Sequence, residues 1–276
     1  MYNQFIDKNS LVDLHIHTCA SDGTSTPMEI IQKAKQSNLR IISITDHDSM
    51  ESLEIADKIA QNNNIILLKG IEISTRKENM YYHVLGYNFA LDDNYLKEIC
   101  NYNKKAFEEK DSIFVDNLIK NGFDIDKSKY ISFHHDPKKG GWKVLNFLIN
   151  ENLCNDIYSF LETYTPGNIL PYAELIHPKK AIESIKHAGG FSVLAHPGSY
   201  ISNVKKLHTI LNEFLGYGIQ GIECYTYKNS KEVTNICLEF CKKNHLFITG
   251  GSDYHGKFDT EKKNELAKIL FKDLYI

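Results

Sequence analysis

Arginine is nearly absent from this chain of 276 residues, in which only Arg40 and Arg76 carry a guanidinium group. The planar fork of arginine is the protein group that best matches a phosphate or carboxylate through two parallel hydrogen bonds. A phosphate site here would therefore depend on lysines, histidines, backbone amides or metal ions. The 32 basic residues are balanced by 35 acidic ones, and the formal charge of -3 excludes an extended basic face for long duplex nucleic acid.

Long apolar runs and paired cysteines are missing as well. No stretch approaches the roughly 18 apolar residues of a membrane helix, and the first residues lack the pattern of a secretory signal. Six cysteines are scattered without a Cys-x-x-Cys pair, so we expect reduced, mostly buried thiols. Cys19 follows two histidines, His15 and His17, that are candidate metal ligands. We interpret its side chain as an apolar filler rather than as a further ligand. The sequence predicts a cytoplasmic protein with no membrane partner.

A globular composition, with 42% hydrophobic residues, accompanies these absences. Short apolar runs that end in polar residues alternate with amphipathic segments in the first third of the chain and again near the C-terminus, a pattern typical of parallel strands with crossover helices. Residues 93–121 instead resemble one long amphipathic helix. We therefore predict an α/β barrel domain at 1–91 and 178–276, interrupted by a helical insertion or cap at 92–177. Residues 261–270 are predicted to form a closing helix.

The segment Asp13-Leu14-His15-Ile16-His17 carries the first chemical signal. Residues two apart on a strand point to the same face, so Asp13, His15 and His17 would project together. Asp22 follows in the next turn. Two imidazoles and nearby carboxylates on one face are a plausible half of a metal site.

Other predicted strands end in, or carry, the same kinds of side chain. In parallel α/β barrels the chemistry gathers at the carboxyl ends of the strands. The further candidate ligands are Asp46, His47, Glu72, His83, His196, Asp253 and His255. A mixed set of imidazoles and carboxylates without thiolates suits Mn²⁺, Fe²⁺ or Zn²⁺.

Seven short motifs, taken together, resemble those of one superfamily. DLHIHT, SDGT, TDHD, GIEIS, HVLGY, AHPG and GGSDYHG occur in this order. They are similar to the metal-binding motifs of the PHP (polymerase and histidinol phosphatase) superfamily, over residues 11–90 and 179–256. Among its members the chain most resembles the stand-alone metal-dependent phosphoesterases. The resemblance implies a distorted (β/α)₇ TIM-like barrel with a trinuclear metal centre.

The resemblance also implies a distribution of the ligands over three divalent metal ions. His15, His17, Glu72 and Asp253 would surround the first metal. Glu72 would bridge to a second metal, which is held also by His83 and His196. Asp22, His47 and His255 would hold the third. Some members of the superfamily have histidine in place of Asp22, which leaves open the metal preference and occupancy of the third site.

Two other carboxylates are interpreted differently from the ligands. Asp13 and Asp46 are expected to orient histidines from behind. Asp46 is also a candidate for proton transfer, and it joins Asp253 and His255 as the predicted catalytic residues. Protonation of the leaving group would need a further acid, either a metal-bound water or a histidine near the metal centre.

The implied mechanism is attack on phosphorus by a hydroxide that bridges two metals, because bound divalent cations lower the pKa of water. The metals would also supply the positive charge that the missing arginines do not. We expect hydrolysis of small phosphate monoesters, such as a nucleotide, a nucleoside bisphosphate, or a sugar or histidinol phosphate. One alternative is 5′ to 3′ trimming of short oligonucleotides, and another is a non-catalytic metal- or nucleotide-binding module. The oligomeric state is not indicated.

Substrate contacts are expected from the insertion and from one strand. Arg76 lies two residues past Ser74 on the segment that carries Glu72. His134, His135 and Lys143 belong to the most reactive-looking part of the insertion. A solvated loop without a role in binding stays open as the alternative for this part. Specificity depends on the positions of such loops, which the sequence does not provide.

Overall fold

A computed structural model describes residues 7–166, 169–201, 203–258 and 265–275. The strands are β1 Leu11–Ile16, β2 Leu39–Ile44, β3 Ile66–Lys77, β4 Met80–Tyr87, β5 Phe191–Leu194, β6 Gly221–Tyr225, β7 Phe247–Gly250 and β8 Ile269–Leu270. The helices are α1 Pro27–Gln36, α2 Leu53–Asn62, α3 Asn94–Lys120, α4 Lys127–Ser132, α5 Lys143–Asn150, α6 Ile157–Tyr164, α7 Pro178–His187, α8 Val204–Gly216 and α9 Lys231–Asn244.

The strands form one eight-stranded sheet in the order β7-β6-β5-β4-β3-β2-β1-β8. The sheet curves until β1 meets the chain that leaves β7. At this seam Ile16 bridges to Tyr254, and the His17 amide donates a hydrogen bond of 2.8 Å to the Tyr254 carbonyl. The predicted α/β class and TIM-like barrel are thereby confirmed, with the short β8 added at the edge of β1.

Strand β4 departs from the expected parallel arrangement. It pairs antiparallel with β3 and with β5, whereas β1, β2 and β3 are parallel to one another and β5, β6 and β7 likewise. Only Glu78 and Asn79 separate β3 from β4, and Glu78 has a φ of 54°, the left-handed conformation of tight hairpin turns. A two-residue link cannot hold a crossover helix. His83 therefore lies in the first half of β4, at the edge where the neighbouring strands end.

The predicted closing helix at 261–270 is wrong for its described part. Residues 261–264 lie outside the described residues, and 265–268 have no helical structure. Ile269 and Leu270 form β8, which pairs antiparallel with Val12 and Leu11 of β1. The alternation of apolar residues in this short stretch is compatible with either element, and pairing with the open edge of β1 decides between them.

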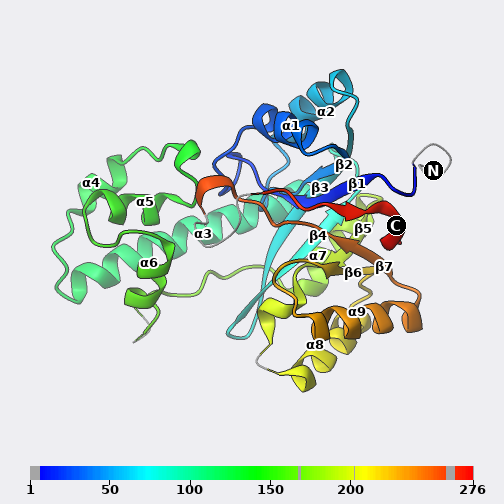
Figure 1. Cartoon of the computed structure of the whole chain (residues 1–276). Helices are drawn as coiled ribbons and strands as arrows, with labels where there is room; N and C mark the ends of the chain where they lie inside the picture. The colour runs from blue at the N-terminus through cyan, green and yellow to red at the C-terminus, as the bar shows by residue number, and fades with distance from the viewer. Residues whose placement is uncertain (1–6, 167–168, 202, 259–264, 276) are drawn as a thin grey trace.

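The helices pack in two layers against the barrel. In Figure 1 α1 and α2 lie on one side of the sheet, and α8 and α9 lie on the other. Their apolar faces join strand side chains such as Ile42, Ile71 and Ile222 in the largest buried cluster. A second buried cluster contains Leu14, Tyr87 and other strand residues. Apolar burial of this extent fixes the strand ends in place.

Helix α1 shows how local sequence positions an element beside the loop that carries Asp22. Thr26 caps its N-terminus, since the Thr26 hydroxyl accepts from the Glu29 amide and the Glu29 carboxylate accepts from the Thr26 amide. Pro27 occupies the first turn, where no amide donor is needed. The cap ends the loop that carries Asp22 at a defined point.

Helices α3 to α6 form a body that extends to one side of the barrel (Figure 1). The predicted long helix is confirmed as α3, which is capped by Asp93 through a bond to the Leu96 amide. This body has its own buried cluster, which includes Phe114, Phe147 and Phe160. Phe258, from the segment after β7, packs against the cluster and joins the body to the barrel. The division into two domains stays a prediction.

None of the helices in the described part of the chain is both long and apolar enough to cross a bilayer.

Phe114→Ala tests the separate core of the helical body. The Phe114 side chain is fully buried, so we expect its truncation to lower the free energy of unfolding by about 3 to 5 kcal/mol. Denaturant unfolding followed by circular dichroism measures the change. The neighbouring Ile113 is 52% exposed, so Ile113→Ala serves as the control and should cost less than about 0.5 kcal/mol. Equal losses in both variants would contradict the assigned core.

Candidate metal centre

Side chains from six segments meet at one edge of the barrel. Their ligand atoms fall into three groups, in each of which all atoms lie within 4.8 Å of one another. The first group is His15, His17, Glu72 and Asp253; the second is His47, Glu72 and His83; the third is His17, Asp22, His47 and His255. We refer to them together as the ligand cluster. The structure thus brings the sequence-predicted ligands into one place, with His196 beside Glu72.

The first group is fully buried and tightly packed. His15 Nε2 and His17 Nε2 lie 3.1 Å apart, and they face Glu72 Oε2 at 3.0 and 3.1 Å. Asp253 Oδ1 lies 3.3 and 3.2 Å from the same two nitrogens. The two imidazole nitrogens and the two carboxylate oxygens therefore converge on one point. A single divalent cation would satisfy all four groups.

Glu72 stands between the first and second groups. Its Oε2 faces His15 and His17, and it also lies 3.4 Å from His47 Nε2. Its Oε1 lies 3.1 Å from His83 Nδ1 and 3.0 Å from His196 Nε2. The two carboxylate oxygens therefore address different sets of imidazoles. This geometry is that of a carboxylate able to bridge two cations.

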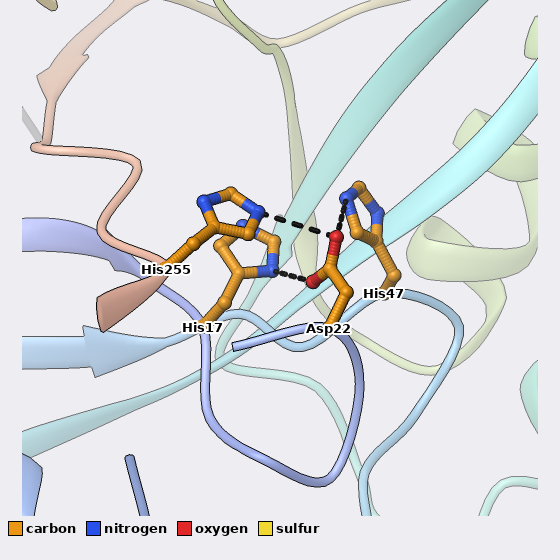
Figure 2. A group of neighbouring side chains, drawn as sticks. All are labelled: His17, Asp22, His47 and His255. Atoms are coloured by element: carbon orange, nitrogen blue, oxygen red, sulfur yellow. Dashed lines mark ion pairs between the residues drawn. The ribbon is translucent and has the colours of Figure 1, made fainter. Parts of the chain in front are cut away.

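In the third group, three imidazoles surround the carboxylate of Asp22 (Figure 2). His17 Nδ1 lies 3.4 Å from Asp22 Oδ1, and His255 Nε2 lies 3.4 Å from Asp22 Oδ2. His47 Nε2 is 3.9 Å from Asp22 Oδ2. His17 thus faces the first group with one nitrogen and the third group with the other, a position that sequence reasoning did not assign to it.

Charge is concentrated in the cluster in spite of burial. Burial disfavours the imidazolium of His15, but the charges of Glu223, Glu72 and Asp253 outweigh it and raise the pKa of His15 to about 10. Burial lowers the pKa of His47 and of His196 to about 3, so both imidazoles are neutral at pH 7. The site therefore draws positive charge and also offers neutral nitrogen lone pairs. Divalent cations need both properties, so the donor set fits them.

Two of these side chains come from strained backbone. Asp253 has a φ of 51° and His196 a φ of 25°, in the left-handed region that residues with a side chain seldom adopt. Gly251 allows the loop after β7 to approach β1, because a Cβ there would lie 2.3 Å from His15 Cβ. The surrounding fold thus holds the ligands in conformations that their local sequence does not favour.

Glu223 is a functional residue that sequence reasoning missed. It is fully buried in β6; its Oε1 lies 2.9 Å from His15 Nδ1, and its Oε2 accepts a bond of 2.7 Å from the His196 amide. It therefore orients one imidazole and the backbone of another. A glutamate between the apolar Ile222 and Cys224 was the available signal, the same pattern that marked Glu72.

Asp13 and Asp46, the two carboxylates expected to orient histidines from behind, instead accept hydrogen bonds that hold loops in place. Asp13 accepts bonds from the amide and hydroxyl of Ser252, at 2.9 and 2.6 Å, so it holds the loop after β7 rather than an imidazole. Burial raises the pKa of Asp13 to about 6. Asp46 accepts bonds from the Thr18 amide and hydroxyl and from the hydroxyls of Ser21 and Ser52. These bonds brace the loop that leads to Asp22; a catalytic role of Asp46 stays a prediction.

The helical body touches the loop that carries the third group. The Gly141 amide donates a 2.8 Å bond to the Asp22 carbonyl. Gly140 has a φ of 72°, and a Cβ there would lie 3.0 Å from the Asp22 carbonyl oxygen. Close approach of these two glycines thus couples the insertion to the position of Asp22.

A cleft of about 1060 Å³ opens beside the cluster, between the helical body and the end of the barrel. Asp22 and His255 line its cluster side, and Trp142 and Tyr158 line the side of the helical body. Lys228, in the loop after β6, also lines it and forms an ion pair with Asp253 Oδ2. Burial opposes the charged form of Lys228, but the charge of Asp253 outweighs it and raises the pKa of the ammonium.

The sequence-predicted substrate residues occupy other surroundings. Arg76 forms an ion pair with Glu174 at 2.6 Å and lies over the ring of Tyr172. Lys143 donates to the Ile131 carbonyl at 3.1 Å. His134 is exposed and His135 is half-buried in the loop before α5. These four residues are not among the described residues that line the cleft, and their role in binding stays a prediction.

Comparison with known proteins identifies one family that this chain resembles. Residues 13–135 match the PHP domain family. A 5′-3′ exoribonuclease of Haemophilus influenzae is 28% identical over 88% of this chain and 89% of its own length. A 3′,5′-nucleoside bisphosphate phosphatase of Chromobacterium violaceum is 27% identical over 88% and 87%. The expected resemblance to the PHP superfamily is thereby confirmed.

A solved structure has the same fold. A crystal structure from Bifidobacterium adolescentis, assigned as a metal-dependent phosphoesterase, superposes with a TM-score of 0.78 at 23% identity, over 94% of this chain and 91% of the other. The architecture of barrel and helical body is thus shared over nearly the whole length of both chains.

Glu223→Gln tests the orientation of the cluster from behind. The amide keeps the volume of the side chain but removes the charge that faces His15 Nδ1, so we expect metal affinity to fall about 10- to 100-fold. Calorimetric titration of the metal-free protein with Mn²⁺ measures the change in affinity. Glu232, exposed in α9, provides the control variant Glu232→Gln. Unchanged affinity in Glu223→Gln would show that the contact does not orient a ligand.

Gly251→Ala tests the close approach of the loop to β1. A Cβ at this position would lie 2.5 Å from the His15 amide nitrogen, so either the loop or His15 must move. We expect a loss of about 1 to 3 kcal/mol in the free energy of unfolding and less metal bound per chain by elemental analysis. Gly216→Ala is the control, because no atom lies within 4 Å of a Cβ there. A fully metal-loaded Gly251→Ala protein of normal stability would refute the argument.

Proposed function

We propose that this chain, whose residues 13–135 match the PHP domain family, is a metal-dependent phosphoesterase that hydrolyses small phosphate esters. The observation that carries the proposal is Glu72, a fully buried carboxylate whose Oε2 faces imidazoles of the first group and whose Oε1 faces His83 of the second. Burial of this many titratable groups lowers the stability of the fold, and a bound cation would offset that cost. The names of the relatives, a bisphosphate phosphatase and an exoribonuclease, both describe cleavage of phosphoric esters.

Three divalent cations would be held by the three groups, and Mn²⁺, Fe²⁺ and Zn²⁺ suit the donors. Bound there, such cations supply Lewis acidity toward a phosphoryl oxygen and activation of water. The number and identity of the ions belong to this proposal. In the distribution that we propose, His15, His17 and Asp253 hold the first ion, with Glu72 shared toward the second.

The residues of the chain supply orientation and charge. Glu223 fixes the ring of His15. The Asp253 carbonyl lies 2.8 Å from His255 Nδ1, so a proton on Nδ1 leaves Nε2 of His255 to face Asp22. His255 is partly exposed and lines the cleft, whereas a pKa of about 3 leaves His47 without a proton to give at pH 7. We propose that His255, rather than His47, assists protonation of the leaving group.

A second candidate function is 5′ to 3′ trimming of short oligonucleotides. The similarity to an exoribonuclease over 88% of the chain favours it, and a cleft of about 1060 Å³ has room for more than a phosphate group. A non-catalytic binding module is less favoured, because the chain has a residue at every ligand position of the resemblance. The cytoplasmic location stays a prediction, as do the small phosphorylated substrate and the absence of a duplex nucleic-acid partner.

Hydrolysis of an aryl phosphate, a mononucleotide and a labelled short oligonucleotide by the Mn²⁺-loaded protein tests the proposal. We expect turnover of at least one ester, and a loss of at least about 1000-fold in His15→Ala and in Asp253→Ala, because each removes a ligand. Removal of metal with a chelator should abolish turnover, and Mn²⁺ should restore it.

Relative rates separate the two candidate functions. Faster cleavage of the mononucleotide supports the small ester, and stepwise shortening of the oligonucleotide from its 5′ end supports the exonuclease. Lys179→Ala, at an exposed pair with Glu183 in α7, serves as a control that should keep full activity. Activity that survives both ligand variants would overturn the metal mechanism, and tight metal without turnover of any ester would favour a binding module.

A further inference from the structure

Lys228 is a charged residue that neither the ligand cluster nor the sequence motifs account for. It follows β6 in the loop that also carries Tyr227, and it is the one lysine or arginine among the described residues that line the cleft. Its side chain is 26% exposed, while its ammonium group pairs with the nearly buried Asp253. The cation thus lies at the boundary between cluster and cleft.

The loop holds Lys228 in a defined position. The Asn229 side chain donates to the carbonyls of Glu223 and Cys224, each at 3.0 Å, and accepts a bond of 2.8 Å from the Gly198 amide. These bonds tie the loop to β6 and to the segment after His196. A residue held by such bonds next to a functional cluster is positioned in advance of any ligand.

The ion pair divides the two oxygens of Asp253. Oδ1 faces His15 and His17, and Oδ2 faces the Lys228 ammonium. An ammonium has three donors, and Lys228 lines the cleft beside the ring of Tyr227. Because the chain has only two arginines and Arg76 is paired with Glu174, a phosphoryl group that enters the cleft meets Lys228 as its nearest side-chain cation of this type.

We propose that Lys228 binds a phosphoryl oxygen of the substrate, and that it does so while it keeps Asp253 Oδ2 turned away from the first group. This inference rests on the proposed function, since it names the contact by which an anionic ester would be held at that site. It assigns to one lysine the task for which the sequence has almost no arginine.

A purely structural role for the ion pair predicts the opposite effect on metal. If Lys228 only supported Asp253, its removal would disorder the carboxylate and weaken metal binding. If Lys228 serves the substrate, its removal leaves Asp253 with more negative charge toward the cations, and metal binding is kept or strengthened. A structural role thus predicts weaker metal binding in the variant. A role in substrate binding predicts weaker phosphate binding with metal binding kept.

The test compares Lys228→Met, Lys228→Arg and the unchanged full chain, all loaded with Mn²⁺. Calorimetry with inorganic phosphate measures the anion contact without any need for turnover. We expect Lys228→Met to bind metal normally and phosphate about 10- to 100-fold more weakly, since a hydrogen bond to a charged group is lost. Lys228→Arg should recover most of the affinity. For any ester that is hydrolysed, KM should rise in Lys228→Met more than kcat falls.

A matched lysine variant is the control. Lys104 pairs with Glu51 at 2.8 Å on the exposed side of α3, so Lys104→Met removes an ion pair and should leave phosphate affinity unchanged. The inference would be overturned if Lys228→Met lost metal while its metal-loaded molecules bound phosphate as tightly as the wild-type protein does. It would also be overturned if the metal-loaded wild-type protein bound no phosphate. Phosphate binding that depends on Lys228 in a protein without turnover would uphold the inference and reject the proposed function.

Discussion

Burial of one carboxylate, Glu72, is the constraint on which the rest of the site depends. A charged group with no exposed surface is stable only when opposite charge or donors surround it. Five imidazoles within 3.4 Å provide these partners, and they come from β1 and the residue after it, from β4, and from the ends of β2 and β5. The barrel is the arrangement that brings chain segments so distant in sequence to one point. Fold and chemistry thus share a single requirement.

The helical body takes part in this arrangement through the loop of Asp22. The Gly141 amide bonds to the Asp22 carbonyl, and Phe258 packs between the body and the segment that follows β7. Two members of the third group, Asp22 and His255, therefore lie on loops that the insertion contacts or adjoins. The third group is also the one that borders the cleft. The cleft therefore lies between the insertion and the third group.

Much of the fold and of the cluster could be predicted, because these features leave local signals. Capping residues mark α1 and α3, and strand ends with acids and histidines mark the edge of the barrel. The reversal of β4 and the strand β8 could not be predicted, since each depends on pairing with a distant edge. Glu223 was overlooked because a lone buried glutamate has no meaning until its partner, 208 residues away, is known.

The sequence by itself determined which residue types can hold metal and the order in which they occur, because those motifs are short and their chemistry belongs to the side chains. Tertiary structure decided how the ligands are shared. It placed His17 between two groups and set Glu223 against His15. It also paired Lys228 with Asp253, and it paired Arg76 with Glu174, away from the cleft lining. Distances between atoms on different strands are set by packing and closure of the barrel, which no local stretch of sequence encodes.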